Sequence, residues 1–190
     1  MNHYIDDVRN FHPSCDQEEA DRRAMLAFIS RNPDVLLREN EAAHFTASSL
    51  IFNQDMDKVL MVYHNIYQNW CWTGGHADGD GDLLHVALKE AEEETSISGL
   101  KVLTPEAVAL DIISVKRHYK NGVFVPTHLH YNLTYALQAD DQDSVRPKPD
   151  ENSGVKWIPL SELQACTAAE PEMIVIYDKI IRRTFALLGI

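Results

Sequence analysis

The sequence predicts a single α/β domain with a mixed central sheet, preceded by a helical extension. Two observations support this prediction. Strand-like runs alternate with helical periods from residue 44 to residue 188, a pattern typical of the α/β or α+β class, and the first forty residues show only a helical pattern. The 190 residues, 45% of them hydrophobic, are enough to bury one core. We therefore assign residues 1–40 to an N-terminal helical extension and residues 41–190 to the α/β domain.

Short runs of β-branched and aromatic residues predict the strands of the sheet. The first two runs, 48–52 and 59–63, flank a polar stretch and predict a hairpin. Three later runs predict further strands at 108–115, 129–137 and 154–159. A charged stretch with prolines, 140–151, predicts a loop between the last two.

Two longer helices and one short helix are predicted after residue 81. Four glycines between residues 74 and 81 predict a loop, after which Asp82 is a suitable cap for a helix over 82–95. A short helix is expected from Ser161, and an amphipathic helix over 171–188 is expected to end before Gly189.

Charge and cysteine content narrow the class of protein. The formal net charge is −12, from 29 acidic and 17 basic residues, and the basic residues are not pooled. A protein that grips a nucleic-acid backbone needs such a pool, so we expect a small-molecule substrate and no nucleic-acid partner. Three distant cysteines fit neither a disulfide framework nor a zinc site, and no apolar run reaches the roughly 20 residues of a membrane span. We expect a cytoplasmic protein with no membrane partner; a homodimer is left open.

The helix over 82–95 contains a cluster of acidic residues. At about 100° per residue, Glu90, Glu93 and Glu94 lie within roughly a third of a turn of one another, beside the apolar stripe of the helix. Like charges at this spacing repel, and a bound cation would offset the repulsion. Oxygen ligands of this kind suit Mg²⁺ or Mn²⁺. A glutamate run met at random is more often a solvated helix face, but the glycine loop before this helix favours the metal interpretation.

Together, the glycine loop and the glutamate helix resemble the Nudix box. With Gly75 as its first glycine, the box places Glu90, Glu93 and Glu94 on the three glutamates that hold metals in Nudix hydrolases. The resemblance spans roughly residues 44–165 and implies the Nudix α/β/α sandwich with a mixed central sheet. It also implies a Nudix-type diphosphohydrolase that uses Mg²⁺ or Mn²⁺ to cleave a diphosphate linkage in a small molecule, such as a nucleoside diphosphate derivative.

The resemblance also implies roles for single residues. Glu93 and Glu94 are expected to be the first metal ligands, with Glu90 as a further ligand or the base, and the backbone carbonyl near Gly75 completing the site. Glu151 or Asp150, from the late loop, is expected to supply a further catalytic carboxylate.

The chain departs from the Nudix box at two functional positions. Gly81 stands where the box has a glutamate, and Lys89 stands at the catalytic arginine position. Lysine lacks the planar fork with which arginine holds carboxylates. A non-catalytic ligand-binding module with the Nudix fold is therefore left open.

Four of the nine histidines suggest a second site. His128 and His130 alternate along one predicted strand and so share a face, while His76 lies in the glycine loop and His44 opens the first strand. Each histidine taken alone is more often a surface or hydrogen-bonded residue.

A secondary similarity to isopentenyl diphosphate isomerases, which share the Nudix fold, raises the metal hypothesis. His44 and His76 match two of their histidine ligands in order, and His128 and His130 fall near their glutamate pair. This similarity implies a second site for a transition-metal ion such as Zn²⁺. It also leaves an isomerase open as an alternative, although these enzymes use a cysteine where this chain has its double glycine.

Overall fold

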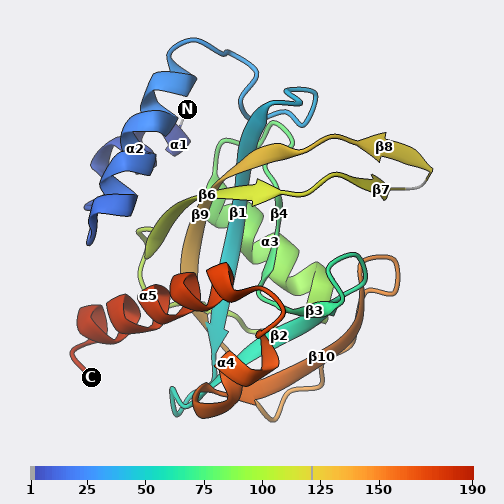
Figure 1. Cartoon of the computed structure of the whole chain (residues 1–190). Coiled ribbons are helices and arrows are strands. Elements are labelled where there is room, and N and C mark those ends of the chain that lie inside the picture. The colour runs from blue at the N-terminus through green and yellow to red at the C-terminus, as the bar shows by residue number, and fades with distance from the viewer. Residues whose placement is uncertain (1–2, 121) are drawn as a thin grey trace.

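The computed structural model describes residues 3–120 and 122–190, which form a sheet with flanking helices (Figure 1). The helices are α1 (His3–Asn10), α2 (Asp16–Ile29), α3 (Leu83–Thr95), α4 (Leu163–Cys166) and α5 (Pro171–Leu188), with a 3-10 turn, η1 (Leu160–Glu162). The first strands are β1 (Ala43–Phe52), β2 (Lys58–His64), β3 (Asn69–Cys71), β4 (Thr73–His76) and β5 (Lys101–Val102). The later strands are β6 (Ala109–Val115), β7 (His118–Lys120), β8 (Val123–Val125), β9 (His128–Gln138) and β10 (Asn152–Pro159). Among the described helices, none has the length and apolar content to cross a membrane.

Strands β1 and β9 form the centre of a mixed sheet. They pair in parallel over their whole common length, from Ala43 opposite Leu129 to Phe52 opposite Gln138. The other edge of β1 is shared by β4 and β2, both antiparallel to it, and β10 and β3 pair with β2. The far edge of β9 is shared by β6 and β5. The predicted mixed central sheet is therefore confirmed.

Residues of β1 alternate between the two faces of the sheet. Phe45 and Ala47 belong to a core that includes residues of α3, while Leu50 and Phe52 belong to a core that includes residues of α5. Figure 1 shows α3 behind β1 and α5 in front of it. Every residue of β1 is buried, as expected for a strand covered on both faces. The α/β/α sandwich is confirmed.

The glycine-rich segment is where the sequence prediction was wrong. Gly74 and Gly75 were expected in a loop, but they lie in β4, paired with Ser48 and Ala47 of β1. A Cβ atom on Gly74 would lie 2.7 Å from the Ala47 carbonyl oxygen. Glycine here permits close approach of two strands, and β4 is too short to show a strand period. The hairpin formed by β7 and β8 was also not predicted.

Helices α1 and α2 occupy the range expected for the extension and share a core with the sheet. Tyr4, Val8 and Met25 are buried in the same cluster as Phe45 of β1. Glu18 of α2 is fully buried and forms salt bridges with Lys179 and Arg183 of α5. The domain boundary at residue 40 stays a prediction, and this shared core favours a single folding unit.

Candidate functional site

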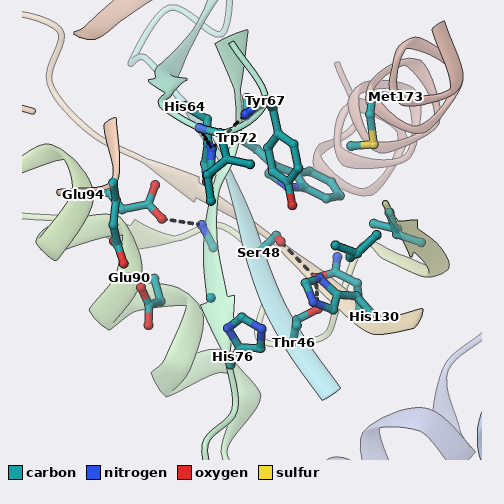
Figure 2. Close-up of a pocket in the computed structure, with 18 of the residues that line it drawn as sticks. Thr46, Ser48, His64, Tyr67, Trp72, His76, Glu90, Glu94, His130 and Met173 are labelled. Carbon is teal, nitrogen blue, oxygen red and sulfur yellow. Dashed lines mark hydrogen bonds between the residues drawn. The ribbon is translucent and has the colours of Figure 1, made fainter. Parts of the chain in front are cut away.

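A cavity of about 280 Å³ opens between the sheet, α3 and α5. Figure 2 shows Glu90 and Glu94 on one side, His76 and His130 on another, and Tyr67 and Trp72 facing them. Two groups of possible metal ligands border this cavity, one of carboxylates and one of imidazoles.

The carboxylate group consists of Glu90, Glu94 and Glu151, each of which offers an oxygen atom within 4.8 Å of the others. Glu94 is only 6% exposed, and the amide of Gly74 donates a hydrogen bond to its Oε1 atom at 3.4 Å. Burial raises the pKa of Glu94 to about 8, and burial together with the nearby Glu93 raises that of Glu90. The carboxyl groups of Glu90 and Glu94 are short of positive charge, a deficit that a divalent cation would remove.

Glu93 lies beside this group. Its carboxylate is 3.2 Å from the Lys148 ammonium and 3.7 Å from that of Lys89, while Lys148 is also 3.0 Å from Glu151. The sequence interpretation named Glu93, Lys89 and Glu151 but missed Lys148, because a single lysine in a charged loop carries no motif. Lys148 links the glutamate helix to the loop that supplies Glu151.

Gly75 lies directly against Glu90. A Cβ atom at Gly75 would lie 2.3 Å from the Glu90 carboxyl carbon, a separation that atoms do not adopt. The absence of a side chain lets the carboxylate approach the β4 backbone. This explains why the box needs glycine at this position.

The cavity has a polar floor formed by β1 and β9. The hydroxyl groups of Thr46 and Ser48 donate hydrogen bonds to the side-chain oxygen Oδ1 of Asn132, at 2.8 and 2.9 Å. These residues alternate with apolar ones along β1, so the sheet turns one polar row toward the cavity. None of the three was singled out as a site residue from sequence.

The second group, here called the histidine cluster, consists of His44, His76, His128 and His130, whose ligand nitrogens all lie within 4.8 Å of one another. The ring centroid of His44 lies 5.0 Å from those of His76 and His128 and 5.1 Å from that of His130. Burial and the surrounding histidines lower the pKa of His130 to about 2. The sheet thus brings together the four histidines named from sequence.

An ion pair adjoins this group. Arg38 donates hydrogen bonds to both carboxylate oxygens of Asp78, one of them at 2.8 Å from its Nε atom. Arg38 lines the cavity together with His76. It places a positive charge, paired with Asp78, in the cavity wall, and no sequence motif marked it.

A sequence model of the NUDIX domain matches residues 42–180, most of the chain. The chain belongs to the Nudix family. The expected family and the Nudix-type hydrolase are confirmed at the level of this match, which includes α3 and its glutamates. Among curated proteins, none matches the chain.

Solved Nudix structures share the fold at low sequence identity. An Ap4A hydrolase from C. elegans, in a binary complex, is 18% identical with a TM-score of 0.54, covering 76% of this chain and 97% of that one. The Nudix domain of NrtR from Shewanella oneidensis, complexed with ADP ribose, is 17% identical with a TM-score of 0.51, covering 85% and 97%. A MutT protein from Methanosarcina mazei Go1 is 13% identical with a TM-score of 0.54, covering 76% and 94%. These similarities extend to the fold.

Proposed function

We propose that this Nudix protein hydrolyses a diphosphate linkage in a small molecule with the help of divalent cations, and that the substrate is a nucleoside diphosphate derivative. The observation that supports the proposal best is the convergence of Glu90, Glu94 and Glu151 in a cavity beside Gly75. The Ap4A hydrolase and the ADP-ribose-bound Nudix domain share the fold and suggest the substrate class.

The carboxylates fit Mg²⁺ or Mn²⁺. Three oxygen donors within 4.8 Å of one another, one of them almost fully buried, match the hard ligands that these ions prefer. We assign Glu90, Glu94 and Glu151 as ligands, together with the Gly75 carbonyl. Glu93 is a further ligand that the family box implies and that is paired with Lys148 in this structure.

Hydrolysis requires water to attack phosphorus while charge moves to the leaving phosphate. Divalent ions held by these carboxylates would neutralise charge on the diphosphate and lower the pKa of water. Glu90 or Glu151 accepts the proton of the attacking water as its oxygen bonds to phosphorus and the bridging P–O bond breaks, leaving its electron pair on the departing phosphate. Lys89 and Lys148 add positive charge at the rim.

The organic part of the substrate needs a separate wall of the cavity. Tyr67 and Trp72 line the cavity across from His76 (Figure 2), and Trp72 is braced edge-on by Tyr177 with ring centroids 5.5 Å apart. Aromatic faces of this kind stack on planar rings. We propose that this wall receives the base or sugar.

A substrate panel tests the proposed activity directly. The purified protein is incubated with a nucleoside diphosphate sugar, a dinucleoside polyphosphate and a nucleoside triphosphate, with Mg²⁺ and Mn²⁺ supplied separately. We expect metal-dependent release of phosphate or nucleotide, abolished by chelator and restored by the ion, because the carboxylates alone do not neutralise the diphosphate. Binding of these compounds without turnover would instead identify a non-catalytic module.

Substituting Gly75 should reduce turnover through Glu90. In Gly75→Ala the new methyl group displaces the Glu90 carboxylate, and we expect kcat to fall by about 10- to 100-fold, as for the loss of groups that orient metal ligands. Steady-state kinetics and thermal unfolding measure the two effects.

Gly74→Ala is the informative comparison. Its methyl group meets the Ala47 carbonyl oxygen and the Ser48 Cα atom, which belong to the β1 backbone. We expect Gly74→Ala to lower the Tm more than Gly75→Ala does. Equal activity in wild type and Gly75→Ala would contradict the assigned contact.

The isomerase alternative finds little support in this chain. Cys71, the cysteine nearest in sequence to the double glycine, is buried. Burial raises the pKa of the Cys71 thiol to about 12. A thiol of this kind is a weak acid and a poor nucleophile at neutral pH. The homodimer and the cytoplasmic location stay predictions.

A further inference from the structure

We propose that the histidine cluster is a binding site for one transition-metal ion of the Zn²⁺ type, separate from the carboxylate site. The ion would join β1, β4 and β9 at one end of the sheet. This inference does not depend on the hydrolase activity, because it rests on the positions of the four imidazoles.

The spacing of the imidazoles suits a single small ion. Two nitrogens bound to Zn²⁺ at 2.0–2.1 Å in a tetrahedron lie roughly 3.3–3.4 Å apart. The Nε2 atoms of His128 and His130 face each other at 3.2 Å, and each of the four rings offers a nitrogen within 4.8 Å of the others. Only a modest adjustment of the remaining rings would complete the coordination.

Backbone carbonyls orient two of the rings. The Nδ1 atom of His44 is 3.0 Å from the Asn40 carbonyl, and that of His128 is 2.9 Å from the Pro126 carbonyl. A carbonyl can only accept, so Nδ1 carries the proton in both rings and Nε2 carries the lone pair. This carbonyl–histidine arrangement is the usual outer support of a histidine metal ligand.

One of these lone pairs has no partner in the described part of the chain. His44 is 3% exposed, and its Nε2 atom is buried without a hydrogen bond among the described residues. A hydrogen bond between the Nε2 atoms of His128 and His130 would satisfy those two atoms. The Nε2 atom of His44 would still have no partner among the described residues. Buried polar atoms are seldom left unsatisfied, and a metal ion accounts for this one.

The donor set distinguishes this site from the carboxylate site. Four imidazole nitrogens favour Zn²⁺, Co²⁺, Ni²⁺ or Cu²⁺ over Mg²⁺, whereas carboxylate oxygens favour Mg²⁺ or Mn²⁺. Four protein ligands also close a tetrahedral site, which is typical of a structural ion. We therefore assign the ion a positioning role.

The strand it would hold is the one next to Glu90. His76 ends β4 opposite Thr46, and His44 lies opposite His130 in the β1–β9 pair. An ion bound by these rings fixes the end of β4, and β4 presents Gly75 to the carboxylates. The histidine cluster would thus stabilise the wall that the two sites share.

The test uses full-length protein without a histidine tag, stripped by chelator and dialysed against Zn²⁺. Elemental analysis should find about one Zn²⁺ per chain, as four ligands allow, and thermal unfolding should shift upward. Loading with Co²⁺ should give the visible bands of a tetrahedral nitrogen site. Mg²⁺ should neither bind there nor displace Zn²⁺.

Variants identify the ligands. His76 and His130 are partly exposed, so the double variant His76→Gln/His130→Gln should still fold, a point checked by circular dichroism. We expect its Zn²⁺ affinity to fall by about 100-fold or more, since losing only the groups that orient ligands costs 10- to 100-fold. His118→Gln, a half-buried histidine outside the cluster, should bind Zn²⁺ like wild type.

The carboxylate variant Glu94→Gln should also keep its Zn²⁺, which separates the two sites. The proposal is overturned if folded wild type binds no Zn²⁺, or if the double variant binds it with unchanged affinity. Loss of hydrolase activity alone would bear on the proposed function and not on this site.

Discussion

Glu94→Gln is expected to lower kcat/KM on the order of 100-fold or more, because metal stabilisation is worth several kcal/mol and about 1.4 kcal/mol corresponds to tenfold. Glu94 is the most buried member of the carboxylate group and accepts a hydrogen bond from Gly74. Glutamine keeps its size but removes the charge that attracts the cation. Because a buried carboxylate is costly without a cation, the fold of the metal-free variant should be at least as stable as wild type.

Two variants of the same helix serve as comparisons. Glu92→Gln changes an exposed glutamate outside the group and should leave kcat/KM within about twofold of wild type, since exposed charges in water interact weakly. The kcat/KM of Glu93→Gln should fall between those of Glu94→Gln and Glu92→Gln, because the Glu93 carboxylate pairs with Lys148 in the structure. Steady-state kinetics at several Mg²⁺ concentrations measures all three. Full activity in Glu94→Gln would refute its assignment as a ligand.

The sequence predicted best those helices and strands that are long enough to show a complete helical or strand period of hydrophobic residues. Helix α3 begins after Asp82, whose side chain accepts a hydrogen bond from the His85 amide at 3.0 Å, as the cap predicted. Helix α5 runs over the predicted residues and ends at Gly189, whose φ of 73° is favourable for glycine. Strand β4 has four residues, too few for a period, and its glycines resemble a loop.

The sequence predicted only part of the carboxylate site, because contacts between distant segments leave no local pattern. Helical spacing gathers Glu90, Glu93 and Glu94, but it cannot show which of them turns toward the loop that carries Glu151. That choice depends on Lys148, which draws Glu93 aside by an ion pair across 55 positions of sequence. Contacts of this kind follow from the fold as a whole, not from a local pattern.

For the histidine cluster, the sequence predicted the four members but not their arrangement in space. Strand alternation places His128 and His130 on one face. Only the parallel register of β1 and β9 sets His44 opposite His130, and only the pairing of β4 with β1 adds His76. Parallel pairing joins segments distant in sequence, so the register could not be read from the chain.

Lys179→Met is expected to lower the free energy of unfolding by about 3–5 kcal/mol, the usual cost of removing one partner from a buried ion pair. The Lys179 ammonium lies 2.5 Å from Asp111 of β6 and 3.2 Å from Glu18 of α2, and both carboxylates are almost fully buried. Methionine has a similar shape but leaves Asp111 with no cation in contact. Urea denaturation measures the loss, and a single transition would show that α2 unfolds together with the sheet.

Two further variants separate the effect of charge on stability from the effect of side-chain packing. Lys101→Met removes an exposed lysine and should change stability by no more than about 0.5 kcal/mol. Adding Asp111→Asn to Lys179→Met should recover part of the loss, because a neutral amide is less costly to bury than an unpaired carboxylate. Arg183 lies 3.3 Å from Glu18 and should keep that second carboxylate paired in both variants. If the double variant is no more stable than Lys179→Met, the loss comes from packing of the lysine stem and not from the unpaired Asp111 carboxylate.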